Sequence, residues 1–203
     1  MLGDRTEAPR TARERRREQT RREILDASWD LAEETGIAGL SFREVARAVG
    51  LQAPSLYTYF DSKDALFDAM FAEGFLQLGE AVAEWTAAVA GKEPTEALST
   101  VMGLWIRFCQ DSLARYQIMF TRAIPGWQPS ADAYAVSMRN YEGMAEALAA
   151  FGITNPADLD LYTAVASGLA AQQIANDPTG DRWIRLAPTA ARMLLDDVDR
   201  RRR

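Results

Sequence analysis

The polar stretch from Gln52 to Lys63 holds side chains whose types and spacing suit contact with a nucleic acid. Its amide, hydroxyl and phenol groups can pair with the edges of bases, and its ammonium group can bind phosphate oxygens. Glutamine can pair with adenine, and threonine can touch the methyl group of thymine. The candidate DNA-contacting residues are Ser41, Arg43, Gln52, Ala53, Pro54, Ser55, Tyr57, Thr58, Tyr59 and Lys63.

Few residues of the chain suit catalysis or metal binding. The sequence has no histidine, which removes Ser-His-Asp and Cys-His catalysis and the commonest metal ligand. It also has no glycine-rich loop of the kind that cradles phosphates. The single cysteine, Cys109, lies among apolar residues without an activating base, so we expect a buried and inert thiol. We predict that the protein is not an enzyme, with no catalytic residue, no metal site and no cofactor.

Two short helices are expected to position the polar stretch. Ser41 and Glu44 have the spacing of a capping box at the start of the first helix. Gly50 follows where a left-handed residue is needed, and Pro54 suits the first position of the second helix. Two helices joined by such a turn form a helix-turn-helix, whose second helix enters the major groove. The apolar residues at helical spacing, or able to face inward, are Phe42, Val45, Ala46, Val49, Leu56, Tyr59 and Phe60.

The same region resembles the TetR family of transcriptional regulators over roughly residues 20 to 70. The resemblance implies a DNA-binding domain in which Lys63 and the helix amides beside it hold a phosphate. This sequence has Pro54 where the family often has Gly, and Ala53 where a polar residue is common, so the base preference is expected to differ. The matching positions are Gly36, Leu40, Val45, Ala46, Gly50, Leu56, Tyr57, Tyr59, Phe60, Ser62, Lys63 and Leu66.

The distribution of charge is uneven. The net charge is −6 at pH 7, which argues against a generally basic nucleic-acid binder. Residues 1–25 nevertheless hold eight arginines against five acidic residues. The arginines at 13–17 are read either as a solvated helix start or as an arm that reaches phosphates. Residues 1–10 are expected to be disordered.

The rest of the chain predicts an all-α fold, because no segment shows the period of a strand. We predict a basic arm at 1–17, the helix-turn-helix domain at 18–66, and a helical ligand-binding and dimerisation domain at 67–203. No run of about eighteen apolar residues and no secretory signal are present, so we expect no membrane partner. The lone cysteine fits a cytoplasmic location.

The last two helices, near 155–176 and 181–198, are the predicted surface of a homodimer. The first is rich in small residues and is expected to be buried nearly all round. The second contains Pro188, which must kink it or split it in two. The alternative is that both helices complete the core of a single chain.

Aromatic and methionine residues are abundant in the middle of the chain. Such residues usually form a core, but as a group they could line an apolar cavity for a small effector, which the resemblance also implies. Polar contacts could come from Arg107, Gln117, Arg122, Asn140 or Gln172. The candidate ligand-binding residues are Trp105, Phe108, Cys109, Met119, Phe120, Trp127, Tyr134, Met138, Tyr141 and Gln172.

The resulting prediction is a ligand-responsive repressor that binds a palindromic operator in double-stranded DNA as a homodimer. Its effector is expected to be a small apolar or aromatic molecule. The alternative is a helical protein-interaction bundle that has lost DNA binding.

Overall fold

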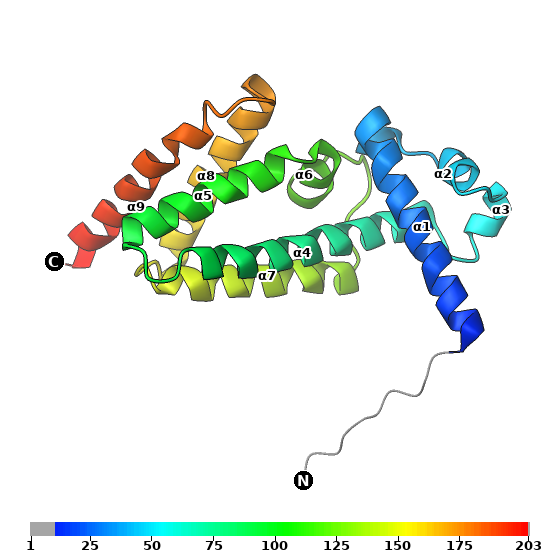
Figure 1. Ribbon diagram of the computed structural model, residues 1–203, viewed down its shortest axis with the longest axis horizontal. Helices are drawn as coiled ribbons and strands as arrows, with labels where there is room; N and C mark the ends of the chain where they lie inside the picture. The colour runs from blue at the N-terminus through cyan, green and yellow to red at the C-terminus, as the bar shows by residue number, and fades with distance from the viewer. Residues whose placement is uncertain (1–10, 203) are drawn as a thin grey trace, which may run out of the picture.

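Residues 11–202 form an all-α structure in the computed structural model (Figure 1). No strand occurs in that range, as predicted. The part of the predicted arm that precedes Thr11 lies outside the described residues. A small unit made of the first three α-helices lies at one end of the long axis, and the C-terminus lies at the other end (Figure 1).

Helix α1 (Ala12–Thr35) begins at a reciprocal hydrogen-bonded cap. Thr11 Oγ1 accepts from the Glu14 backbone N–H at 3.2 Å, and Glu14 Oε2 accepts from the Thr11 N–H at 2.7 Å. Two orphan donors of the first turn are thereby satisfied. The predicted end of the arm at residue 17 falls inside this helix, so the boundary of the arm stays a prediction.

The helix-turn-helix has the predicted geometry. Helix α2 (Phe42–Ala48) ends at a turn in which Gly50 has φ 70°, and helix α3 (Ala53–Leu56) follows. The Leu51 N–H donates to the Ala46 carbonyl at 2.8 Å, which closes the end of α2. A residue with a Cβ would be strained at this φ, so glycine is required.

The predicted capping box at Ser41 and Glu44 is wrong. Ser41 makes no side-chain cap hydrogen bond. Its backbone carbonyl instead accepts from the Val45 N–H at 3.0 Å and starts the helix. The hydroxyl of Ser41 is therefore left for other partners.

Helix α4 (Lys63–Ala88) joins the small unit to the rest of the molecule. Ser62 Oγ caps it by accepting from the Ala65 N–H at 3.0 Å, as expected for Asp61 or Ser62. The helix runs without a break across the predicted domain boundary at 66/67 (Figure 1). That boundary stays a prediction.

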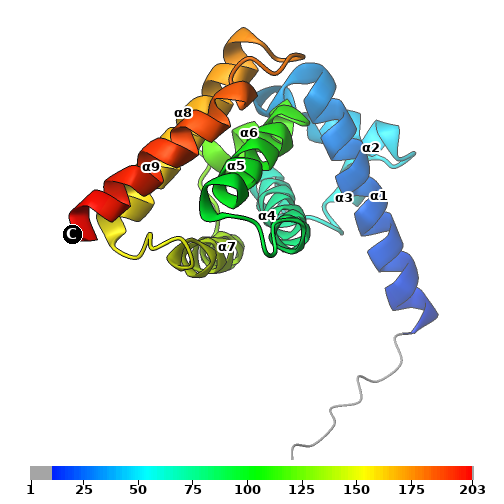
Figure 2. The same ribbon diagram turned by 60° about the vertical axis from the view of Figure 1, so that its left-hand side comes forward.

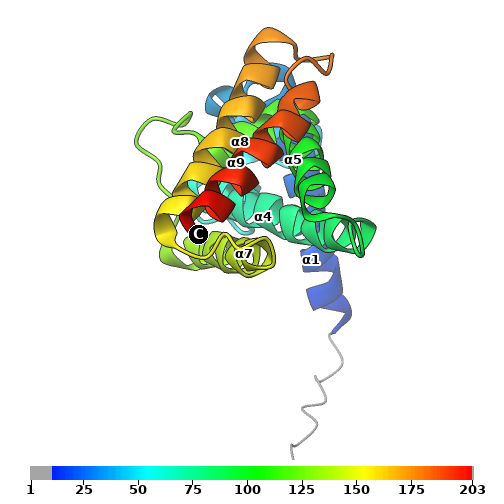
Figure 3. The ribbon, with the colours of Figure 1, turned by 90° about the vertical axis from the view of Figure 1, so that its left-hand side faces the viewer.

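The larger body consists of helices that pack on α4 and on one another. Helices α6 and α7 pack against α4, whereas α8 and α9 pack against α5. Figure 2 shows α8 and α9 running beside each other, away from α2 and α3, and Figure 3 shows them lengthwise next to α5. The body helices are α5 (Pro94–Gln110), α6 (Leu113–Phe120), α7 (Ala131–Ala149), α8 (Pro156–Asn176) and α9 (Ala187–Arg202).

The last predicted helix, near 181–198, is split in two, which is one of the two outcomes expected from Pro188. A 3-10 helix, η2 (Ile184–Leu186), precedes α9, and Pro188 lies in the first turn of α9, where no backbone donor is needed. The prediction that α8 is buried nearly all round is wrong for the single chain. Leu161, Ala164 and Gly168 are exposed, because no other element of the described chain covers that face.

Helix α1 also contacts the body directly. Glu33 Oε1 accepts from the Ala114 N–H at 3.3 Å and bonds to the Ser112 hydroxyl. A carboxylate at this position satisfies orphan donors at the N-terminus of α6. The small unit is thus attached to the body through α1 as well as through α4.

The contact between α4 and α6 predicts opposite effects of two glycine substitutions. A Cβ at Gly74 would lie 2.6 Å from Met119 Sδ and 3.1 Å from Met119 Cγ, whereas a Cβ at Gly143 meets nothing within 4 Å. We expect Gly74→Ala to lower the free energy of unfolding by about 1–3 kcal/mol through overpacking. The control, Gly143→Ala on exposed α7, should raise it by about 1 kcal/mol. Urea denaturation measures both, and equal effects would show that Met119 has room to move.

Candidate DNA-binding and ligand sites

Helix α3 is held by its apolar side so that its polar side faces outward. Leu56 and Phe60 are buried in the core of the small unit. Gln52 precedes the helix as its N-cap residue, makes no side-chain cap bond and is exposed. Its amide is therefore available to an external partner.

The remaining polar groups of α3 are held by local contacts. The Thr58 hydroxyl donates to the Ser55 carbonyl at 2.7 Å, which fixes its direction and leaves its methyl group to point elsewhere. Tyr57 is 53% exposed, and its ring meets Phe42 edge-on with centroids 5.0 Å apart. Ser55 is half-buried. This exposed tyrosine has a packed base and a free hydroxyl end, as a phosphate contact requires.

The other candidate DNA-contacting residues lie on α2, on or just after α3, and at the start of α4. Arg43 is exposed on α2 and Pro54 is exposed on α3, whereas Ala53 and Tyr59 are half-buried. Lys63 is the first residue of α4, and its Nζ lies 5.1 Å from the centre of the Phe67 ring. A helix N-terminus with a lysine beside it suits an anion.

Two arginines of α1 hold the polar stretch just after α3. This role was not predicted from the sequence. Arg17 donates to the Thr58 carbonyl at 3.0 Å, and Arg21 donates to the Tyr59 carbonyl at 2.6 Å. The guanidinium of Arg21 also lies 4.0 Å from the centre of the Phe60 ring, and its burial lowers the pKa of Arg21. Their spacing of four residues places both on one face of α1, which is the one signal that the sequence offered.

A cavity of about 760 Å³, partly open to solvent, lies between α4, α5, α7 and α8. Its wall is mostly apolar, and its size suits a drug-sized ligand. Five predicted ligand-binding residues line it: Trp105, Phe120, Tyr134, Met138 and Tyr141. Asn140, named as a polar contact, lines it as well.

The other five predicted ligand-binding residues do not line this cavity. Phe108 and Cys109 are buried in the core cluster, and Met119 packs at Gly74. Trp127 packs edge-on against Phe67 and Phe71. Gln172 is exposed and bonds to Asn176.

Several lining residues come from helices that the sequence analysis treated as a connector or a dimer surface. Their periodicity showed an apolar face, but no signal distinguished a cavity wall from ordinary packing. Those from α4 and α8 include Phe75, Leu78, Val82, Trp85, Tyr162 and Ala166.

Cys109 is expected to be unreactive in the folded protein. The thiol is 1% exposed, and desolvation raises the pKa of Cys109 to about 12. Alkylation of the native protein at mildly alkaline pH should be more than about 100-fold slower than in denaturant, because it requires unfolding. Mass spectrometry against time measures this. Since the folded pKa is raised, the stabilisation from Cys109 is full below its ordinary value of 9.0 and is lost as the pH rises toward 12.

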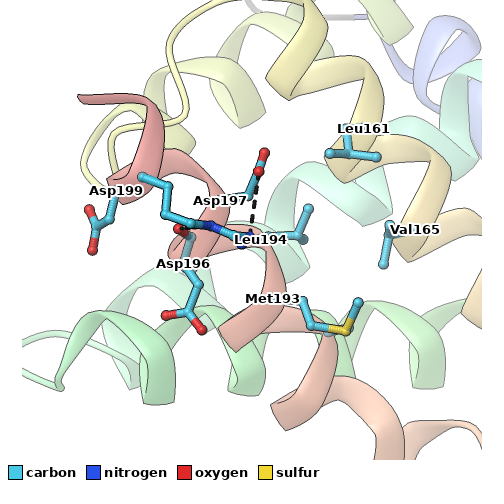
Figure 4. A pocket seen from close by; sticks show the side chains of 9 residues that line it. Leu161, Val165, Met193, Leu194, Asp196, Asp197 and Asp199 are labelled. Carbon is cyan, nitrogen blue, oxygen red and sulfur yellow. Dashed lines mark hydrogen bonds and ion pairs between the residues drawn. The ribbon is translucent and has the colours of Figure 1, made fainter. Parts of the chain in front are cut away.

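A shallow groove lies on the surface formed by α8 and α9, as Figure 4 shows. Leu161 and Val165 face Met193 and Leu194 across it, and Asp196, Asp197 and Asp199 lie toward its end (Figure 4). Met193 is 65% exposed in the single chain. The groove is thus an apolar surface with an acidic border.

An exposed short helix after a four-residue turn, carried by an all-α body, defines a helix-turn-helix transcription regulator. The family model for bacterial regulatory proteins of the tetR family matches residues 24–70. The class D tetracycline repressor protein of Escherichia coli is 42% identical over 53 residues, which are 26% of this chain and 24% of that protein. Residues 24–70 are therefore similar to the corresponding part of TetR-family proteins, and the resemblance read from the sequence is confirmed over that segment. The match spans about a quarter of the length of that repressor.

Two solved structures share the fold over most of the chain. The regulatory protein SCO4313 superposes with a TM-score of 0.75 and 21% identity, covering 93% of this chain and 100% of that one. The transcriptional regulator FadR from Bacillus subtilis, in complex with stearoyl-CoA, has a TM-score of 0.61 and 15% identity, covering 86% of this chain and 97% of that one. None of the described helices is long and apolar enough to cross a membrane.

Proposed function

We propose that this protein is a dimeric repressor that leaves a palindromic operator when a small, mainly apolar effector enters the cavity. The observation that carries the proposal is the course of α4. The helix begins at Lys63, just after the polar segment that contains α3, and its residues Phe75, Leu78 and Val82 line the cavity. One rigid element therefore touches both sites.

DNA binding is assigned to the exposed groups of the helix-turn-helix. Gln52, Ser55 and Thr58 reach base edges, whereas Ser41, Arg43, Tyr57 and Lys63 hold phosphates. Two copies place their α3 helices in successive major grooves, about 34–36 Å apart.

Release follows if the effector binds more tightly to a conformation in which α4 is shifted. The two α3 helices then no longer match the spacing of the half-sites, and the operator is released. The structurally similar regulator FadR binds stearoyl-CoA, whose long acyl chain supports a ligand with a large apolar part for this fold.

Selection of bound duplexes from a random DNA pool at several salt concentrations tests the proposal. A palindromic site whose affinity falls steeply with salt is expected. Absence of enrichment with a folded protein would favour the alternative, an interaction bundle without DNA binding.

The Gln52→Ala variant tests base reading directly. Because the amide of Gln52 has no hydrogen-bond partner in the described part of the chain and Ala cannot pair with adenine, we expect specificity to relax at one position in each half-site, by about 1–3 kcal/mol. Repeating the selection measures this. Tyr57→Phe is the control and should weaken binding to all sequences alike. An unchanged set of selected sequences with Gln52→Ala would remove Gln52 from base recognition.

A further inference from the structure

The cavity wall contains no ionised side chain. None of the lining residues, all within the described part of the chain, is Asp, Glu, Lys or Arg. Arg107 and Arg122, considered as polar contacts from the sequence, are exposed and do not line it. An ion transferred into such a site loses its hydration and finds no opposite charge, so it is strongly disfavoured.

Three of the polar side chains on α4 and α7 that line the cavity are already engaged. The Thr86 hydroxyl donates to the Val82 carbonyl at 2.8 Å, and the Asn140 amide donates to the Val136 carbonyl at 3.2 Å. The Ser137 hydroxyl donates to the Tyr134 carbonyl at 2.8 Å. These groups satisfy their own helices and have no donor bond left to direct a ligand, apart from the second amide hydrogen of Asn140.

The hydroxyl of Tyr162 is a donor in the cavity wall without an acceptor. Tyr162 is 6% exposed, and its hydroxyl makes no hydrogen bond within residues 11–202. Desolvation raises the pKa of Tyr162 to about 12, so this hydroxyl stays protonated at neutral pH. Tyr162 lines the cavity from α8.

We propose that the effector is an uncharged, mainly apolar molecule with a carbonyl or ether oxygen that accepts a hydrogen bond from Tyr162. A protonated phenol whose O–H has no partner is stabilised by such an acceptor. A carboxylate, a phosphate or an amine does not fit, because the wall offers no counter-charge. An ester, ketone, lactone or amide carried on a ring or chain is the class that the wall selects. This inference rests on the proposed effector cavity.

A matched series of naphthalenes on the full-length protein tests the proposal. Methyl 2-naphthoate, 2-naphthoate, 2-naphthylmethylamine and 2-ethylnaphthalene share a ring and differ in the polar group. Calorimetric titration at neutral pH should rank the ester first, with the two ions at least about tenfold weaker, since each would be buried without a partner. The hydrocarbon should be about fivefold weaker than the ester, the effect of a neutral hydrogen bond.

The Tyr162→Phe variant supplies the second measurement. It removes the donor and keeps the aromatic ring, so the ratio of ester affinity to hydrocarbon affinity should fall toward one. A general loss of packing would weaken both ligands and leave the ratio where it was, which would overturn the role of Tyr162. Tighter binding of either ion, or binding of none of the four probes, would overturn the proposed class.

Failure here is distinguishable from failure of the proposed function. Release of the selected operator by the ester is measured separately, by fluorescence anisotropy. If the ester ranks first but does not release the operator, the proposed induction is wrong and the ligand class stands. If an ion ranks first and releases the operator, the induction stands and the ligand class is wrong.

Discussion

The Met193→Glu variant is expected to be monomeric and to lose roughly 100-fold or more of the affinity for a palindromic operator, because two linked half-site contacts become one. In the single chain the new carboxylate is solvated, since Met193 is 65% exposed. In the proposed dimer the groove of α8 and α9 faces a second copy, and the carboxylate would be desolvated without a partner. Light scattering after gel filtration measures the oligomeric state, and anisotropy with labelled operator measures affinity.

Leu76→Glu on α4 is the matched control. Leu76 is 58% exposed and has acidic residues three and four positions away, Glu73 and Glu80, just as Met193 has Asp196 and Asp197. Both substitutions therefore replace an exposed apolar side chain and add the same local repulsion. A Met193→Glu variant that remains dimeric would place the dimer surface elsewhere.

The Arg21→Ala variant should weaken operator binding by about tenfold or more, because a charged hydrogen bond to a backbone carbonyl contributes about 1.5–3 kcal/mol. Without Arg21 the Tyr59 carbonyl loses its 2.6 Å donor and Phe60 loses the guanidinium above its ring. The residues just after α3, including Tyr57 and Thr58, are then less firmly held. They therefore lose more conformational entropy when they bind DNA. Anisotropy titrations at several salt concentrations measure the effect.

The dependence on salt separates positioning from direct phosphate contact. A lost phosphate contact lowers the slope of log affinity against log salt by about one, whereas a lost positioning contact leaves it unchanged. Arg22→Ala is the control, because it removes the same charge from the next residue of α1, where the side chain is 70% exposed and 3.7 Å from Glu73. If Arg21→Ala reduces the slope by about one per half-site, Arg21 contacts DNA.

The local features of the helix-turn-helix could be predicted from sequence because their causes lie within a few residues. Gly50 ends α2, Ser62 caps α4 and the pair Thr11 and Glu14 caps α1, each through contacts with neighbours in the chain. Ser41 had the same signal without the bond, since its carbonyl alone begins α2. Spacing shows that a cap is possible, but the geometry of the preceding segment decides whether it forms.

The tertiary contacts could not be predicted in the same way. Trp105 and Phe108 are three residues apart on α5, yet one lines the cavity and the other packs under Arg115 in the core. Their spacing gives both an inward direction, and the choice depends on which helix lies opposite each of them. The bonds of Arg17 and Arg21 to the Thr58 and Tyr59 carbonyls, just after α3, likewise join residues that are 41 and 38 positions apart.

The contact of Glu33 with the start of α6 has a consequence for chimeric regulators. Exchange of DNA specificity between relatives is simplest by joining the N-terminal unit of one protein to the body of another within α4. Such a junction at residue 66 keeps α4 continuous but pairs the α1 of one parent with the α6 of the other. A body without a hydroxyl at the position of Ser112 would leave Glu33 with only the backbone N–H at the position of Ala114. A transplanted DNA-binding unit therefore needs both its connection through α4 and its contact with α6. The residues at the start of α6 should be transferred together with it.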